Sequence, residues 1–140
     1  MADILNFHYL VDGDDFTSAG KASVMVKKNL RQLGLPPEII RRVSIAMYEG
    51  EINMVIHAGG GTADVNVTED YIEIILKDTG PGIKDIDKAM EEGYSTATDN
   101  IRSLGFGAGM GLPNMKKNSD SMEITSTVGV GTRITMRVKL

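Results

Sequence analysis

Hydrophobic residues recur at helical spacing through the first part of the chain. Between Phe16 and Leu33 they return every three or four residues, which predicts an amphipathic helix that Gly34 ends. Pro36-Pro37 opens a second helix, because the fixed φ of proline suits a first helical turn. This helix runs to about Ala58, where consecutive glycines stop it.

Alternating hydrophobic and polar residues predict strands elsewhere. The first strand covers residues 2–11. Residues 62–68 and 71–78 form one hairpin, and residues 121–128 and 132–140 form another. The residues expected on the buried face of these strands are Ala63, Val65, Val67, Ile72, Ile74, Leu76, Thr132, Ile134, Met136, Val138 and Leu140.

The remaining segments are a short helix over residues 85–91, a long polar loop over 93–111 and a short helix that begins near Gly111. Long loops in compact domains tend to be functional. Two hairpins with segregated helices predict an α+β fold, in which helices cover one face of a mixed, mostly antiparallel sheet as a two-layer sandwich. We expect residues 1–140 to form a single domain.

Composition excludes several kinds of site. The chain has no cysteine and two histidines, which excludes disulfide scaffolds, zinc–cysteine sites, thiol nucleophiles and multi-histidine metal centres. The net charge of -4 gives no basic footprint for a nucleic acid, and no polybasic segment predicts a membrane partner. The first residues have no signal-peptide pattern, so a cytoplasmic location is expected.

Two polar residues interrupt the second helix on a side that its pattern predicts to be buried. At about 100° per residue, Glu49 and Asn53 share a face with the isoleucines Ile45, Ile52 and Ile56. A carboxylate there would cost roughly several kcal/mol unless it is neutralised, paired or bound to a metal. On spacing alone, hydrogen bonds between the two side chains or to nearby backbone are favoured. Glu51 points to the opposite side and is expected to be solvated.

A third polar residue, Asp78, shares the inward face of its strand with isoleucines and a leucine. The simple interpretation is a carboxylate that accepts backbone N–H groups in the turn over residues 79–82. Thr132 lies on the inward face of the last strand, and by itself it is most simply a satisfied hydroxyl.

Glycines occupy alternate positions in residues 105–111, and a helix follows directly. Exposed N–H groups and the helix dipole favour an anion at such a point. A dinucleotide-binding loop is excluded because no strand precedes the glycines, and a P-loop is excluded because Leu112-Pro113 replaces the lysine and Ser/Thr pair. A flexible hinge is an equally good interpretation of the glycines alone.

In combination these motifs are specific. Glu49-x-x-x-Asn53, Asp78-Thr-Gly-Pro-Gly82, Gly107-Ala-Gly-Met-Gly111 and Gly129-Val-Gly131-Thr132 occur in this order. The chain thereby resembles the GHKL superfamily, whose ATP-binding fold is shared by gyrase, the ninety-kilodalton heat-shock chaperone, histidine kinases and mismatch-repair ATPases. The resemblance covers nearly the whole chain, so we expect neither a phosphoacceptor-histidine helix pair nor a transducer domain.

Two further stretches are similar to one branch of that superfamily. Glu92-Gly-Tyr-Ser-Thr96 and Gly109-Met-Gly-Leu-Pro113-Asn-Met-Lys-Lys117 look most like the switch-protein serine kinase of bacterial partner-switching systems. The stand-alone members of this branch are small serine/threonine kinases and anti-sigma factors.

The resemblance implies ATP and Mg²⁺ as cofactors and a role for each anomalous residue. Asp78 would accept from the exocyclic amine of adenine, Thr132 would support that contact, and Gly82 would let the purine approach the backbone. Asn53 would ligate Mg²⁺, and Glu49 would orient or deprotonate the attacking hydroxyl. The other residues expected to contact the nucleotide are Gly80, Ile83, Gly107, Ala108, Gly109, Met110, Gly111 and Leu112.

The glycines would line the phosphates beneath a lid made of about residues 93–110. In sporulation-type anti-sigma kinases an arginine just before the glycine run is expected to touch the γ-phosphate, but here Gly107 takes that position. Arg102, Lys116 and Lys117 are the candidates to replace it, and each could equally be an ordinary solvated charge.

The implied function is an ATP-dependent protein serine/threonine kinase that phosphorylates a small antagonist-type (STAS-like) partner, with a sigma factor or a phosphatase as a further partner. One alternative is a nucleotide-dependent binding module that sequesters a sigma factor or phosphatase without catalysis. Another is a detached histidine-kinase catalytic domain. The sequence leaves homodimer formation open.

Overall fold

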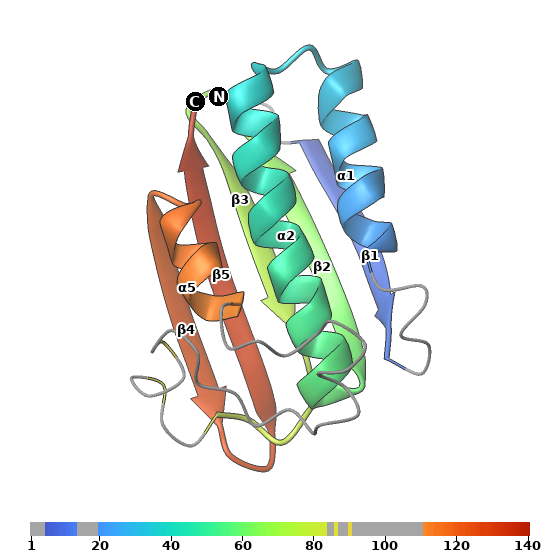
Figure 1. The fold of residues 1–140 in the computed structure, drawn as a ribbon, viewed down its shortest axis with the longest axis vertical. Coiled ribbons are helices and arrows are strands. Elements are labelled where there is room, and N and C mark those ends of the chain that lie inside the picture. The colour runs from blue at the N-terminus through green and yellow to red at the C-terminus, as the bar shows by residue number, and fades with distance from the viewer. Residues whose placement is uncertain (1–4, 14–19, 84–85, 87–89, 91–110) are drawn as a thin grey trace.

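The computed structural model describes residues 5–13, 20–83, 86, 90 and 111–140. Within these residues, helices cover one face of a five-stranded sheet (Figure 1). The strands are β1 (Leu5–Asp12), β2 (Gly60–Val67), β3 (Tyr71–Lys77), β4 (Ser121–Thr127) and β5 (Gly131–Lys139). The helices are α1 (Lys21–Gln32), α2 (Pro37–Ala58) and α5 (Gly111–Lys117).

The sheet has the strand order β1-β2-β3-β5-β4, and all of its neighbouring strands are antiparallel. The predicted α+β two-layer sandwich is confirmed, although the described sheet is antiparallel throughout rather than mixed. Pairing of β3 with β5 joins the two hairpins and places Lys77 opposite Arg133. Asp78 and Thr132 therefore meet where β3 ends and β5 begins.

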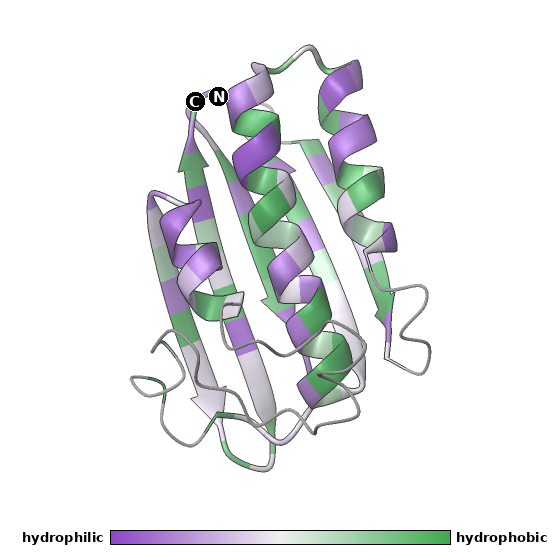
Figure 2. Ribbon diagram, viewed as in Figure 1, coloured by the Kyte–Doolittle hydropathy of each residue, from purple (hydrophilic) through white to green (hydrophobic). Residues whose placement is uncertain are grey.

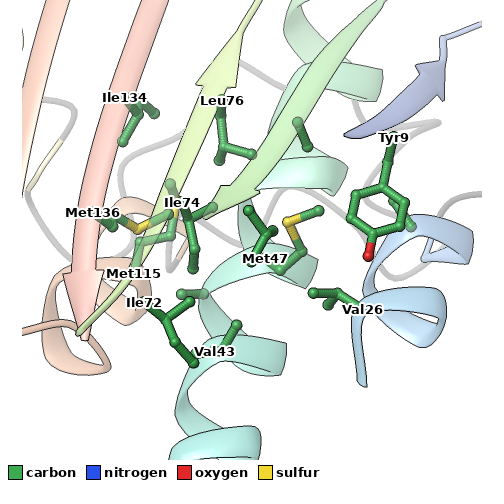
Figure 3. Packing of buried hydrophobic residues seen from close by; sticks show 14 of the residues in the cluster. Tyr9, Val26, Val43, Met47, Ile72, Ile74, Leu76, Met115, Ile134 and Met136 are labelled. Carbon is green, nitrogen blue, oxygen red and sulfur yellow. The ribbon is translucent and has the colours of Figure 1, made fainter. Parts of the chain in front are cut away.

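The core lies between the sheet and the helices. Met47 of α2 packs in the same cluster as Val26 of α1, Met115 of α5 and Ile74 of β3 (Figure 3). Hydrophobic and hydrophilic residues alternate along β5 (Figure 2), because successive side chains of a strand point to opposite faces. The predicted inward residues of the hairpins are buried except Leu140, which is 47% exposed because it follows the end of β5.

Glycines set two of the boundaries. Gly20, with φ 99°, directly precedes α1, so the helix begins later than the pattern from Phe16 predicts; residues 14–19 lie outside the described residues. Gly59, with φ 71°, ends α2 as predicted. Gly60 and Gly61 already pair with β1, so β2 begins before the predicted residue 62.

Helix α2 runs along the middle of the sheet, between α1 and α5 (Figure 1). The predicted helix over residues 85–91 falls mostly outside the described residues, although the Met90 N–H donates to the Ile86 carbonyl at 3.0 Å, as in a helix. In the part of the chain that the structure describes, no helix is both long and apolar enough to cross a membrane.

The prediction that Glu51 is solvated is wrong. Its side chain is only 2% exposed. Its two carboxylate oxygens accept the backbone N–H groups of Ala22 and Ser23, each at 3.1 Å. The helical wheel places Glu51 opposite Glu49, but that side of α2 faces α1 and not solvent. Glu51 therefore caps the first turn of α1 from a neighbouring helix.

Candidate functional site

The first group of site residues surrounds Asp78, directly after β3. Its Oδ1 accepts the backbone N–H groups of Gly80 at 3.0 Å and of Thr132 at 3.2 Å. The Asp78 N–H donates in turn to the Thr132 carbonyl at 3.0 Å. The interpretation of Asp78 as a turn carboxylate is thus confirmed for Oδ1. Among the described residues no donor reaches Oδ2, and the side chain is half-buried.

Three glycines allow the chain to close around Asp78. A Cβ at Gly80 would lie 2.6 Å from the Ala58 Cα, and a Cβ at Gly131 would lie 2.2 Å from the Asp78 carbonyl. A Cβ at Gly61 would lie 2.4 Å from the Lys77 carbonyl. Real Cβ atoms do not approach other atoms so closely. These glycines therefore hold the Asp78 turn against both β5 and the end of α2.

A hydroxyl pair lies beside this turn. Thr132 is 8% exposed, and its Oγ1 lies 2.9 Å from the Ser126 Oγ. The Ser126 Oγ also accepts the backbone N–H of Ile83 at 2.7 Å and donates to the Gly131 carbonyl at 3.3 Å. Thr132 is therefore a satisfied hydroxyl, and Ser126 fixes the segment that carries Ile83. Ser126 is not among the residues predicted from the sequence, although a serine on the inward face of β4 is a detectable signal.

Gly82 adopts φ +80°, and a Cβ there would lie 2.6 Å from the Thr127 carbonyl. The fold itself requires this glycine, because the end of β4 occupies the space that a side chain would need. The expected approach of a purine to Gly82 stays a prediction.

The second group of site residues lies where α2 meets the start of α5. Glu49 and Asn53 are half-buried, as are Ile45 and Ile56. Ile52, the third isoleucine of the stripe, is buried at 8% exposure, so the predicted buried side is confirmed there, whereas Glu49 itself lies at the margin of that side. The buried face of α2 is a neighbouring one that includes Met47.

Gly111, the first residue of α5, adjoins both side chains. A Cβ at Gly111 would lie 3.5 Å from the Asn53 Oδ1 and 3.7 Å from the Glu49 Oε2. The Asn114 Nδ2 donates to the Glu49 Oε1 at 3.4 Å. Within the described residues Glu49 is bonded to Asn114 and neither to Asn53 nor to nearby backbone, so neither form of the favoured interpretation is borne out for Glu49. Asn114 is likewise not among the predicted site residues.

Helix α2 connects the two groups. Asn53 faces α5, and Ala58 contacts the Asp78 turn through Gly80. Ala58 follows Asn53 by five positions in α2, which corresponds to about 8 Å along the axis. Both groups therefore contact the same helix, which sets the distance between them.

Several predicted residues do not enter these groups. Arg102, the lid and the nucleotide contacts at Gly107, Ala108, Gly109 and Met110 lie outside the described residues. Leu112 is buried in the core, so any ligand contact would involve its backbone. Lys116 and Lys117 are exposed in the last turn of α5, at the opposite end from Gly111. Their expected roles stay predictions.

The oxygen atoms of Glu49 and Asn53 suit a hard cation. Magnesium prefers oxygen ligands and usually binds through one or two protein groups together with substrate phosphates. No cluster of three or more His, Asp or Glu side chains that could hold a metal occurs among the residues that the structure describes. These two residues therefore fit a metal ion that is bound partly by the protein and partly by the phosphates of a ligand, and not one that is bound by protein groups alone.

Comparison with known proteins gives consistent matches. The family described as the histidine kinase-like ATPase domain matches residues 14–138. The serine/threonine-protein kinase RsbT of Bacillus subtilis (strain 168) is 34% identical over 108 residues, which cover 74% of this chain and 75% of that protein. The anti-sigma F factor of Clostridium novyi (strain NT) is 35% identical over 125 residues, which cover 85% and 84% of the two chains.

A solved structure has the same fold. The RsbU and RsbW domains of a Mycobacterium tuberculosis protein superpose with a TM-score of 0.66 over 97% of this chain and 32% of theirs, at 15% identity. Such a low identity supports the fold alone. The superfamily resemblance predicted from the four motifs is confirmed by these matches.

Proposed function

Because the chain belongs to the histidine kinase-like ATPase family, we propose that it is an ATP-dependent protein serine/threonine kinase of the anti-sigma and switch-kinase type. The names of its relatives support this class and do not favour a binding module without catalysis. The observation that carries the proposal is the placement of Glu49 and Asn53 together beside the start of α5.

Adenine would bind at the Asp78 turn. Oδ1 is held by two backbone N–H groups, which fixes the carboxylate and leaves Oδ2 to accept the exocyclic amine. The Thr132 and Ser126 hydroxyls beside it, 2.9 Å apart, would support the purine directly or through water. This arrangement supports recognition of adenine by a rigid acceptor.

The phosphates would extend along α2 toward Asn53. The Asn53 Oδ1 would hold Mg²⁺ together with phosphate oxygens, and Mg²⁺ would neutralise phosphate charge when bound. The space beside Gly111, where a Cβ would lie in ordinary contact with Asn53 and Glu49, supports this placement.

Glu49 would act on the attacking hydroxyl. It would accept the proton of the partner's serine or threonine as the hydroxyl oxygen bonds to the γ-phosphorus and the bond to the β-phosphate oxygen breaks, which releases ADP. Phosphoryl transfer depends mainly on positioning and charge neutralisation, so few protein groups are needed. Arg102, Lys116 and Lys117 are the candidates for contact with the γ-phosphate.

The protein substrate would be a small antagonist-type (STAS-like) partner. The names of two relatives, a serine/threonine-protein kinase and an anti-sigma factor, support a partner-switching role in which a sigma factor or phosphatase is a further partner. The single domain, the lid, the cytoplasmic location and homodimer formation remain predictions.

Incubation with γ-labelled ATP, Mg²⁺ and a candidate antagonist tests the proposal. We expect acid-stable phosphate on a serine or threonine of the partner, and a loss of transfer in Glu49→Gln with nucleotide binding retained. Glu123→Gln is the matched control, because Glu123 is exposed on β4. Acid-labile phosphate would instead indicate a histidine-kinase catalytic domain, and ATP binding without any transfer would indicate a binding module.

A further inference from the structure

Asn114 is in direct contact with the carboxylate that the proposed reaction depends on. Gly111 and Asn114 are three residues apart in α5, so both lie on the helix face that meets α2. The Asn114 Nδ2 donates to the Glu49 Oε1, and the missing Cβ of Gly111 adjoins the Glu49 Oε2. The two carboxylate oxygens of Glu49 therefore have different surroundings.

Asn114 is itself well placed to act as a fixed donor. Its backbone carbonyl accepts the Asn118 Nδ2 at 2.9 Å and the Asn118 N–H at 3.1 Å. Among the described residues, Asn114 provides the hydrogen bond that reaches the Glu49 carboxylate. A hydrogen bond to an ionised acceptor is stronger than a neutral one, and bonds to catalytic groups are often long before the ligand binds. The distance of 3.4 Å is at that long end.

We propose that Asn114 is a positioning residue for Glu49, an inference that rests on the proposed function. By holding Oε1, the amide turns Oε2 toward the start of α5 and Asn53, where the γ-phosphate and the incoming hydroxyl would meet. A base that can rotate freely presents the correct oxygen only part of the time. Asn114 therefore acts on the transfer step and not on the affinity for nucleotide.

Kinetics and binding together test this role. Asn114→Leu keeps a similar size but removes the donor, and we expect kcat to fall about 10- to 100-fold, as for other residues that orient a reactive group. The Kd for ATP should change less than about 2-fold. Asn114→Asp, which places a second carboxylate beside Glu49, should reduce kcat at least as much. Gln32→Leu removes an exposed amide at the end of α1, is the matched control and should retain kcat.

A double-mutant cycle separates positioning from general damage to α5. In a Glu49→Ala background, Asn114→Leu should cause no further loss of transfer, because the group it positions is gone. Full additivity of the two losses, or an equal loss in Gln32→Leu, would overturn the assignment.

The contact can also be measured without catalysis. In NMR spectra of the nucleotide-free protein, the side-chain amide signals of Asn114 should shift in Glu49→Ala, while those of Asn118 stay in place. Unchanged Asn114 signals would overturn this inference alone. A wild-type chain that shows the shift but transfers no phosphate to any hydroxyl would instead overturn the proposed function.

Discussion

The two carboxylate oxygens of Asp78 have different roles: Oδ1 holds the turn, and Oδ2 is the proposed acceptor for adenine. A substitution that changes only Oδ2 can therefore test the second role by itself. Oδ1 accepts two backbone N–H groups, and in Asp78→Asn the amide oxygen can keep both of these bonds. The amide nitrogen would then replace Oδ2 and present a donor to the donor amine of adenine. The fold should survive while the base contact is lost.

Asp78→Asn should therefore weaken ATP binding by roughly 1–3 kcal/mol, the cost of leaving a buried polar group without its partner. Isothermal calorimetry measures the affinity, and circular dichroism checks that the fold is retained. Asp70→Asn, in the exposed turn between β2 and β3, is the control and should bind ATP normally. Unchanged affinity in Asp78→Asn would contradict the adenine assignment.

Gly111 offers a second substitution at the residue scale. Its φ lies outside the left-handed region, and an added Cβ would make only ordinary contacts with Asn53 and Glu49. Gly111→Ala should therefore fold with unchanged or slightly higher stability, because alanine favours a helix over glycine. The methyl group would fill the proposed phosphate position, so Mg²⁺·ATP binding should weaken about 10-fold or more, roughly 1.4 kcal/mol.

Fluorescence titration with a labelled nucleotide would measure this loss. Gly34→Ala is unsuitable as a control because Gly34 has φ +75°. Ser121→Ala, at the exposed start of β4, provides a better one and should leave binding intact. Normal nucleotide affinity in Gly111→Ala would show that the phosphates bind elsewhere.

At the scale of elements, α1 depends on a side chain from α2. The first turn of a helix has N–H groups without intrahelical partners, and Glu51 satisfies two of them, at Ala22 and Ser23. The N-cap position itself is Gly20, which makes no side-chain cap. The start of α1 is therefore specified by a residue that is distant in sequence.

Glu51→Ala should destabilise the protein by about 1–3 kcal/mol, because the two amides would be left buried without acceptors. Urea denaturation would measure the change in unfolding free energy. The exposed Glu123→Ala should stay within about 0.5 kcal/mol of wild type. Equal stability of Glu51→Ala and Glu123→Ala would show that α1 finds other acceptors.

The last turn of α2 gives a pH dependence. Burial lowers the pKa of His57 below its ordinary value of 6.5. The unfolded chain therefore takes up a proton at His57 at a higher pH than the folded chain does, and stability is lost as the pH falls through and below 6.5. A positive charge is stabilised near a helix C-terminus, but for His57 the loss of solvation on burial outweighs that stabilisation.

Unfolding free energies of wild type and His57→Gln at pH 8 and pH 5.5 would test this effect. The stability of wild type relative to the variant should decrease at the lower pH, by at most about 1.4 kcal/mol for each unit of pKa shift. A relative stability that rises toward pH 5.5 would reverse the assigned sign.

At the scale of the whole molecule, ligand and fold stabilise each other. A ligand that binds only the folded state at 100 times its Kd adds about 2.7 kcal/mol to stability. Mg²⁺·ATP should therefore raise the Tm, and a chelator should remove part of this rise in wild type. In Asn53→Ala the Tm with nucleotide should be lower and insensitive to the chelator. An Asn53→Ala protein whose Tm still responds fully to the chelator would exclude Asn53 as the metal ligand.

The features that the sequence predicts correctly are mostly those that depend on residues close together in the chain. The hairpins follow from the spacing of neighbouring residues, so their buried faces agree with the structure and their bounds differ by about two residues. The extent of α2 also agrees, but its buried face is only in part the one that its spacing predicts. The roles of Glu51, Ser126 and Asn114 depend on partners that the fold brings from far along the chain: Glu51 bonds Ala22, and Asn114 bonds Glu49 across 65 residues. Periodicity gives the direction of a side chain but not which element covers it.

The two acids on the middle of α2 have a final consequence. Glu49 and Glu51 project about 200° apart around the helix axis, one toward α5 and the other into α1. Because Glu49 is bonded to α5 and Glu51 to α1, α2 cannot rotate about its axis to improve one contact without breaking the other. Inserting a single residue between them would rotate one acid away from its partner by about 100°, so natural variants should not change the length of the chain within that turn.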